Sequence, residues 1–157
     1  MRIVRLEKGS AYWSAAGRLI EGSYQPSRVN PLSLPVDGNA WADQAAKGHP
    51  RLRAVHAVVD EELLAVADAS VTLLAPHIAV RRLGVIDNLA WGATWDQTVV
   101  TAAIEASFTW LKTVADVAWL DAPQLALAPA GAIEAMGLQV QYNRFVKSLA
   151  ARSSAAP

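Results

Sequence analysis

The residues around Gly92 could bind a phosphate group, because they lie between a predicted strand and a predicted helix. Apolar residues from His77 to Ile86 predict a buried strand. Apolar spacings of three and four predict a helix that begins near Trp95, and Thr94 and Gln97 have the spacing of a capping box. The start of a helix presents free backbone N–H groups to an anion. A single glycine is a weak signal, so a joint without a ligand is the competing interpretation.

Histidine and tyrosine side chains offer candidates for acid–base chemistry. His56 and His77 fall on or beside predicted strands, and Tyr142 falls in the last apolar stretch. An imidazole has a pKa suited to a general base, although a single histidine in a strand more often serves packing. The Tyr142 phenol could reach a cleft or could lie at an edge in water. These three residues are weak catalytic candidates, and the catalytic group stays unknown at this stage.

The composition limits the kinds of site that the chain can build. The 157 residues include no cysteine and three histidines, so we predict no disulfide, no cysteine nucleophile and no metal site. Residues 54–134 carry three basic and ten acidic side chains, whereas the basic residues are divided between the two ends. This distribution argues against a nucleic-acid partner. No apolar run is long enough to span a membrane and the first residues do not resemble a signal peptide, so we expect a cytoplasmic protein.

Periodicity and turn residues predict an alternating order of strands and helices. A long helix between two strands predicts that those strands, 77–86 and 116–120, are parallel neighbours. A proline-rich loop separates the first two helices. The expected strands cover residues 2–7, 52–59, 63–74, 77–86, 116–120 and 138–149, and the expected helices cover 11–21, 40–47, 95–113 and 126–136.

This order of elements, together with the turn Glu134-Ala135-Met136-Gly137-Leu138, resembles the GNAT superfamily of N-acetyltransferases. The resemblance implies a single α/β (α+β) domain over residues 1–149. Its mixed, twisted sheet would contain an antiparallel meander followed by a strand-helix-strand crossover. Residues 150–157 would then form a disordered tail.

The resemblance also implies a cofactor and a place for it. GNAT members bind acetyl-CoA in the splay between the fourth and fifth strands and through backbone N–H groups at the start of the helix after the fourth strand, which begins here near Trp95. The partners so implied are acetyl-CoA and a small-molecule amine, and the resemblance allows a homodimer. The implied cofactor-binding residues are Val85, Asp87, Trp91, Gly92, Ala93, Thr94 and Trp95.

Several positions depart from the family pattern. The phosphate loop of the family is Arg/Gln-x-x-Gly-x-Gly/Ala; with its first glycine at Gly92, Leu89 stands in place of the Arg/Gln and Thr94 in place of the second small residue. Asp96 falls in the first helical turn, where it would stabilise the helix start or repel a pyrophosphate. Many members carry a helix tyrosine that protonates the leaving thiolate, and Ile133 stands at that place here.

Two functions therefore remain open. The first is a GNAT-type enzyme that transfers an acetyl or acyl group from acyl-CoA to an amine. The second is a GNAT-like binding or dimeric structural module without transferase activity. The altered phosphate loop and Ile133 favour the module, whereas the order of the elements favours the enzyme.

Overall fold

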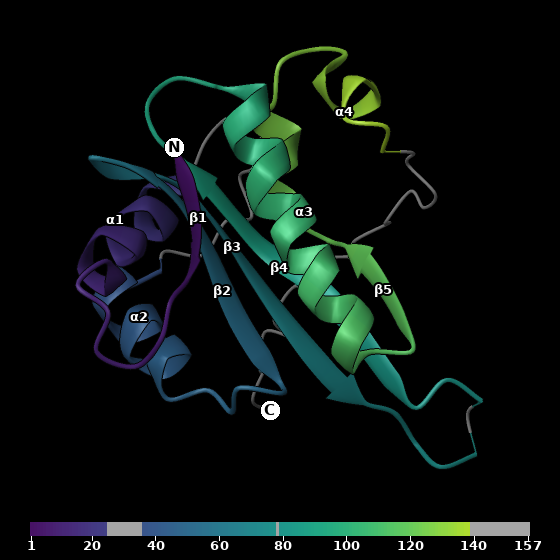
Figure 1. Cartoon of the computed structure of the whole chain (residues 1–157). Helices are drawn as coiled ribbons and strands as arrows, with labels where there is room; N and C mark the ends of the chain where they lie inside the picture. Colours follow the sequence, from purple (N-terminus) through teal and green to yellow (C-terminus); the bar gives the residue numbers. More distant parts are fainter. Residues whose placement is uncertain (25–35, 78, 139–157) are drawn as a thin grey trace, which may run out of the picture.

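The computed structural model describes residues 1–24, 36–77 and 79–138, which form one five-stranded sheet with helices on both faces (Figure 1). The strands follow the spatial order β1-β2-β3-β4-β5; the first four are antiparallel neighbours, and β5 is parallel to β4. The strands are β1 (Arg2–Arg5), β2 (Arg53–Asp60), β3 (Glu62–Leu73), β4 (Arg82–Trp91) and β5 (Val117–Leu120). The helices are α1 (Trp13–Ser23), α2 (Gly38–Ala46), α3 (Gln97–Val114), the 3-10 helix η1 (Pro123–Leu127) and α4 (Ala132–Ala135).

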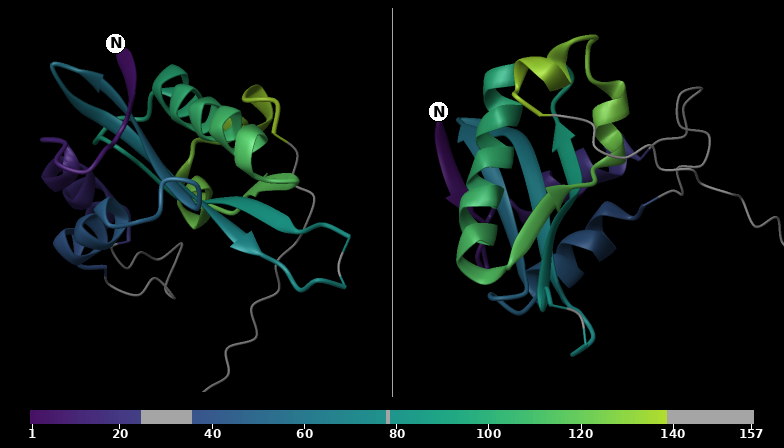
Figure 2. Two further views of the ribbon diagram at one scale, coloured as in Figure 1. Left: turned by 60° about the horizontal axis from the view of Figure 1, so that its bottom comes forward. Right: turned by 90° about the vertical axis from the view of Figure 1, so that its right-hand side faces the viewer.

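The sheet separates two layers of helices. Helix α3 covers one face, and α1 with α2 covers the other (Figure 2). Strand β3 supplies both faces by alternation: Ala65, Ala67 and Ala69 belong to the core under α3, and Val66 belongs to the core under α1 and α2. Both cores are apolar, and the expected GNAT fold class is confirmed by this arrangement.

Two close approaches fix the helices on the sheet. A Cβ atom added at Gly84 would lie 2.7 Å from Leu111 Cδ2, so glycine in β4 lets α3 pack closely. A Cβ added at Gly17 would collide with the backbone of Gly38, and the reverse is also true. Helices α1 and α2 therefore contact each other through backbone, and a side chain at either glycine would separate them.

The predicted parallel pairing of β4 and β5 is confirmed, but the bounds of β4 are wrong. The strand covers 82–91 and not 77–86. Residues 74–77 and 79–81 instead belong to the connection from β3, where the Leu74 N–H bonds to the Arg81 oxygen at 2.8 Å. The Asp116 carboxylate accepts the N–H groups of Arg81 and Arg82, which fixes the start of β4. Apolar residues in the connection extended the predicted strand backwards.

Two predicted helices also need correction, one in its start and one in its continuity. Helix α3 begins at Gln97 after an Asp96 cap, and Thr94 is not the cap. The helix expected over 126–136 is divided into η1 and α4, because Pro129 lacks an N–H and Gly131 is left-handed at φ 77°. The predicted turn at residues 134–138 is present: Gly137 N–H bonds to Glu134 O at 2.9 Å and Leu138 N–H to Ile133 O at 3.2 Å.

Strand β5 was expected to be buried, and it is not. Val117 and Trp119 are 40% and 47% exposed. Within the described ranges β5 is the last strand of the sheet, which leaves one edge and part of one face uncovered. The strand expected over 138–149 and the tail expected over 150–157 lie outside the described residues, apart from Leu138.

Candidate functional site

The candidate site lies where β4 and β5 stop pairing and separate, a place that we call the split. The two strands pair from Leu83 and Val117 to Ile86 and Leu120, and the Asp121 N–H bonds to the Ile86 oxygen at 2.9 Å. Beyond Ile86, no described strand pairs with β4 on that side. The Gly92 N–H bonds to Leu64 on β3 at 3.0 Å, so by alternation the backbone groups of Leu89 and Trp91 point into the split.

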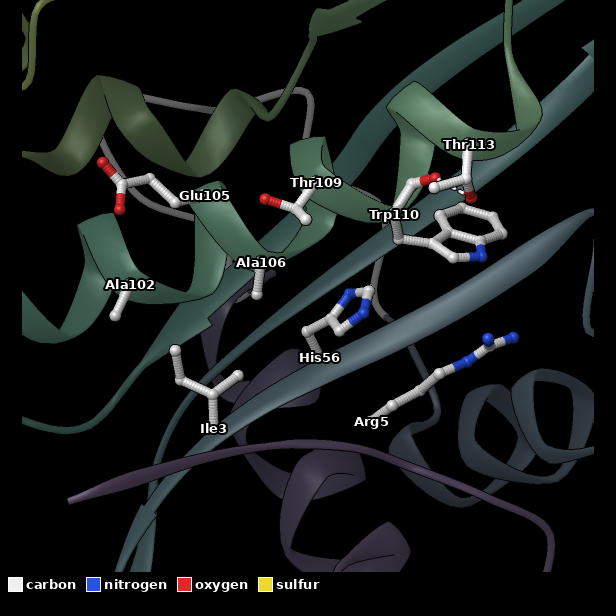
Figure 3. A pocket seen from close by; sticks show the side chains of 9 residues that line it. All are labelled: Ile3, Arg5, His56, Ala102, Glu105, Ala106, Thr109, Trp110 and Thr113. Atoms are coloured by element: carbon white, nitrogen blue, oxygen red, sulfur yellow. Dashed lines mark hydrogen bonds between the residues drawn. The ribbon is translucent and has the colours of Figure 1, made fainter.

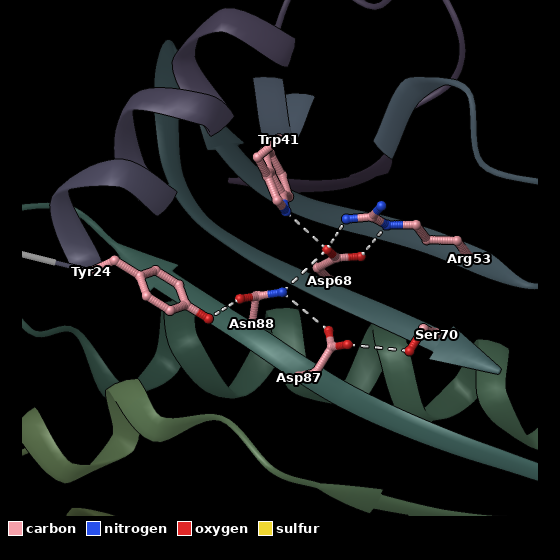
Figure 4. A network of polar contacts seen from close by, with 7 residues as sticks. All are labelled: Tyr24, Trp41, Arg53, Asp68, Ser70, Asp87 and Asn88. Carbon is pink, nitrogen blue, oxygen red and sulfur yellow. Dashed lines mark hydrogen bonds and ion pairs between the residues drawn. The ribbon is translucent and has the colours of Figure 1, made fainter. Parts of the chain in front are cut away.

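A β-bulge lies at the point of separation. Ile86 pairs with Ala69 and Asn88 pairs with Asp68, so Asp87 is the extra residue of β4. A bulge disturbs the alternation of side chains, and here both Asp87 and Asn88 take part in one polar cluster on the α1/α2 face. We call this cluster the Asp68–Asp87 network; its members are Tyr24, Trp41, Arg53, Asp68, Ser70, Asp87 and Asn88 (Figure 4).

Asp68 is the buried anchor of the network. Its side chain is 1% exposed and accepts two hydrogen bonds from Arg53, from Nε at 3.0 Å and from Nη2 at 2.5 Å. Trp41 Nε1, on α2, donates to Asp68 Oδ2 at 3.1 Å. The paired donors of a guanidinium match a carboxylate, so Asp68 is held as an anion in a fixed orientation.

Asn88 joins the anchor to the bulge. Its Nδ2 donates to Asp68 Oδ2 at 3.4 Å and to Asp87 Oδ1 at 3.2 Å. Its Oδ1 accepts the hydroxyl of Tyr24, which follows α1. Ser70 Oγ donates to Asp87 Oδ2 at 3.3 Å. Groups from β3, β4 and α1 thus meet around one carboxyl beside the split.

The electrostatics of the network favour acid–base chemistry near neutral pH. Burial raises the pKa of the Asp87 carboxyl to about 6, and the nearby charge of Asp68 adds to the rise; Ser70 and Arg53 oppose it. Burial also raises the pKa of the Tyr24 phenol, with opposition from the side chain of Gln124 on η1 and further rises from Asp87 and Asp68. Asp87 can therefore exchange a proton near neutral pH, and Tyr24 keeps its proton there.

The structure places the expected cofactor residues at different points along β4 and the loop that follows it. Asp87 lies in the bulge and Val85 lies in the half of β4 that pairs with β5. Trp91 and Trp95 pack edge to face with ring centroids 4.9 Å apart, against the core under α3. Ala93 and Thr94 are exposed between β4 and α3. The Gly92 amide is bonded to Leu64, so this expected phosphate donor is already used.

The first turn of α3 is also occupied. Asp96 Oδ1 accepts the N–H groups of Thr98 at 2.9 Å and Val99 at 3.2 Å. Of the two roles considered for Asp96, stabilisation of the helix start is the one that the geometry supports. A pyrophosphate would meet a carboxylate at the place where it would need these amides.

The expected catalytic histidines are not part of the site. His56 is 7% exposed on β2, and its Nδ1 lies 3.0 Å from Ser107 Oγ on α3. Burial lowers the pKa of His56 to about 4, and the charge of Arg5 lowers it further. His56 lines a shallow groove of about 550 Å³ between β1, β2 and α3 (Figure 3), and none of the residues that line this groove belongs to β4 or β5. His77 is exposed in the β3–β4 connection. Tyr142 lies outside the described residues.

Sequence reasoning missed most of the network. Arg53, Asp68 and Asn88 were not among the candidates. One signal was available: Asp68 is a single acid within the apolar stretch LLAVADASV, and a buried carboxylate requires partners. Nothing in the sequence indicated which residues those partners would be.

Two further findings concern other kinds of site. No helix in the described residues is long and apolar enough to cross a membrane. In the same ranges, no group of three or more His, Cys, Asp or Glu side chains could hold a metal ion.

Comparisons with solved structures agree on the fold. The chain superposes on a mutant of the BH1408 protein from Bacillus halodurans with a TM-score of 0.73, 16% identity and coverage of 95% of this chain and 99% of that one. For the aminoglycoside N-acetyltransferase AAC(6')-Iy in complex with CoA, the TM-score is 0.67 at 13% identity, and the match covers 93% of this chain and 92% of that one. For the aminoglycoside 6'-N-acetyltransferase AAC(6')-IG from Acinetobacter haemolyticus, the TM-score is 0.66 at 14% identity, and the match covers 94% of this chain and 97% of that one. No family model and no curated protein sequence matches the chain. The chain therefore has the fold of GNAT acetyltransferases.

Proposed function

We propose that the chain is a GNAT-type N-acyltransferase that transfers an acetyl or other acyl group from acyl-CoA to a small-molecule amine. The observation that carries the proposal is the bulge at Asp87. It presents a carboxyl with a pKa raised to about 6 at the point where β4 and β5 separate. Similarity of fold to acetyltransferases supports the same class of reaction, although fold alone does not establish it.

The site suits the pantetheine arm of acyl-CoA better than its pyrophosphate. No described strand pairs with Leu89 and Trp91 on the side of the split, so their backbone groups would bind an extended pantetheine arm as a strand binds its neighbour. The start of α3 suits the pyrophosphate poorly, because Asp96 already caps it. When bound, acyl-CoA would supply an activated acyl group. We therefore expect weak binding governed by the split rather than by the helix start.

Asp87 and Tyr24 would divide the proton transfers between them. The acceptor nitrogen loses a proton as it forms an amide bond, and the Asp87 carboxylate would take that proton. A base with a pKa near the working pH is efficient in this role. The Tyr24 hydroxyl would give a proton to the leaving group, which would replace the tyrosine that the family pattern places at Ile133. Asn88 holds both groups in position.

A similar solved structure and the charge of the site indicate which acceptor amines to test first. The neighbours include an acetyltransferase solved with the aminoglycoside sisomicin, so polyamine-like acceptors form a reasonable first panel. The acidic carboxyls on the α1/α2 face would favour such a cation. The cytoplasmic location and the homodimer remain predictions from the sequence.

The proposal is tested by binding and by turnover. Calorimetric titration with acetyl-CoA measures binding, and release of free CoA thiol in the presence of an aminoglycoside or a polyamine measures transfer. Asp87→Asn should lower kcat by about 10²- to 10⁴-fold and leave acetyl-CoA affinity unchanged. Asp116→Asn, which removes a carboxyl at the opposite end of β4, is the matched control and should retain activity.

The second candidate function remains the binding or structural module. The observation in its favour is the Asp96 cap, which occupies the amides that a pyrophosphate would use. Absence of acetyl-CoA binding at millimolar concentration, with no transfer to any amine in the panel, would favour the module and reject the enzyme.

A further inference from the structure

Asp68 does not border the split, yet it is the most strongly bound member of the network. Six hydrogen bonds converge on it and on its neighbour Asp87: Arg53 donates two and Trp41 one to Asp68, Ser70 donates one to Asp87, and Asn88 donates one to each. A buried ion pair of this kind adds little to stability by itself, because both charges must leave water. Its presence beside the candidate base therefore suggests another role.

The Asn88 amide has one arrangement that satisfies all its partners. Its two N–H groups donate to the two carboxylates, and its oxygen accepts from Tyr24. Rotation of the amide by half a turn would place its oxygen against Asp68 and Asp87 and its N–H₂ group against the Tyr24 hydroxyl. The fixed anion of Asp68 therefore fixes the Asn88 amide, and the amide orients Asp87 Oδ1 and the Tyr24 hydroxyl.

We propose that Asp68, held by Arg53 and Trp41, is a positioning residue that acts through Asn88 to orient Asp87 and Tyr24 at the split between β4 and β5. The inference rests on the proposed function, because it assigns Asp87 and Tyr24 the proton transfers of that reaction. It adds residues of α2 and β2 to the site, although neither element borders the split.

The arrangement has an electrostatic consequence of known sign. Among the residues that the structure describes, the charged and titratable groups that face Asp87 are Asp68 on β3, Arg53 on β2 and Tyr24 after α1, with Ser70 as a neutral donor. Removal of the Asp68 charge by Asp68→Asn should lower the pKa of Asp87. Removal of the indole N–H dipole by Trp41→Phe leaves the Asp68 charge less compensated, and should raise the pKa of Asp87.

Carboxyl carbon NMR of the full chain measures both shifts without any substrate. The Asp87 resonance is assigned by its loss in Asp87→Asn. Asp68→Asn should move its titration midpoint down by roughly one pH unit, and Trp41→Phe should move it up by a fraction of a unit. The matched control is Trp13→Phe, because Trp13 packs edge to face on Trp41 but donates its Nε1–H to Glu7 O. This control should leave the midpoint unchanged.

A purely structural role for Asp68 predicts a different result. Both variants would then lower the unfolding midpoint and leave the Asp87 titration where it is, which overturns the proposal. If Asp68→Asn does not fold, the comparison of Trp41→Phe with Trp13→Phe decides the matter alone. With an amine that the protein acetylates, the acidic limb of kcat/KM should move with the NMR midpoint in each variant. Absence of transfer in the wild-type protein rejects the proposed function, and the NMR result then still decides whether Asp68 and its partner Trp41 tune the pKa of Asp87.

Discussion

The two faces of the sheet are both covered by helices, but one face is packed with apolar residues and the other also contains a polar network. Under α3, strand β3 presents Ala65, Ala67 and Ala69, all fully buried, and the main buried polar contact is between His56 and Ser107. Under α1 and α2, the same strand presents Val66, then Asp68 and Ser70 in the network. The α3 face serves packing, and the α1/α2 face holds charged groups at the split.

The difference shows where strand alternation is kept and where it is broken. The α3 face is regular, because small residues on β3 and Gly84 on β4 let one long helix lie across it. The α1/α2 face contains the bulge at Asp87, which adds a side chain to that face and starts the separation of β4 from β5. Irregularities of this kind are common beside functional sites.

The largest expected effect comes from breaking the buried ion pair on the α1/α2 face. Arg53→Met leaves Asp68 buried without its cation and should lower the free energy of unfolding by about 3–5 kcal/mol. Arg82→Met breaks the more exposed pair with Asp116 and is the control, with a much smaller loss expected. Urea denaturation of both variants measures the difference. Equal losses of the free energy of unfolding in the two variants would mean that burial of Asp68 without its cation costs no more than loss of an exposed ion pair.

The next effect concerns the α3 face. Leu111 is fully buried against Gly84, so Leu111→Ala should leave a cavity and lower the free energy of unfolding by about 2–5 kcal/mol. Phe108→Leu, at a half-buried position on the same helix, should cost less. Thermal unfolding measures both variants. A melting temperature of Leu111→Ala close to that of the parent would show that the face of α3 is wrongly assigned.

The two faces should respond to pH with opposite signs. The pKa of Asp87 is raised from 3.8 to about 6, so its contribution to stability is present below pH 4 and lost as the pH rises through 6. The pKa of His56 is lowered from 6.5 to about 4, so its contribution is present above pH 6.5 and lost as the pH falls through 4. Since one pKa unit is worth about 1.4 kcal/mol, the contribution is at most about 3 kcal/mol for Asp87 and about 3.5 kcal/mol for His56.

Single variants separate the two contributions. In the parent, acidification from pH 7 to pH 4 adds the stabilising contribution of Asp87 and removes that of His56. Asp87→Asn lacks the first contribution, so the free energy of unfolding of this variant should fall more steeply than that of the parent over this range. His56→Gln lacks the second contribution, so the free energy of unfolding of this variant should fall less steeply or rise. Urea midpoints at several pH values test both signs. Parallel curves for the parent and both variants would show that neither group changes its pKa on folding.

The smallest expected effect lies at the start of α3. Asp96→Asn keeps a capping oxygen and removes a negative charge, so acetyl-CoA affinity should rise by about two- to tenfold at low salt. Asp37→Asn makes the same change at the cap of α2 and should not affect affinity. Calorimetric titration compares the variants. Tight binding by the parent with no gain in Asp96→Asn would mean that the pyrophosphate does not approach this helix start.

The sequence by itself determined the features that depend on local patterns. The spacing of apolar residues placed α3 and its buried face, and Gly137 placed the turn after α4, because helix periodicity and a left-handed glycine act over a few residues. The long crossover helix determined that β4 and β5 are parallel, because few other connections are possible.

Only the tertiary structure decided the bounds of β4 and the members of the site. The bulge at Asp87 depends on pairing with β3, and pairing between distant segments leaves no local signal in the sequence. Arg53 and Asp68 are 15 residues apart, and Tyr24 and Asn88 are 64 apart. A carboxyl pKa depends on which of these groups surround it, so the chemistry of Asp87 followed from the fold and not from its neighbours in the chain.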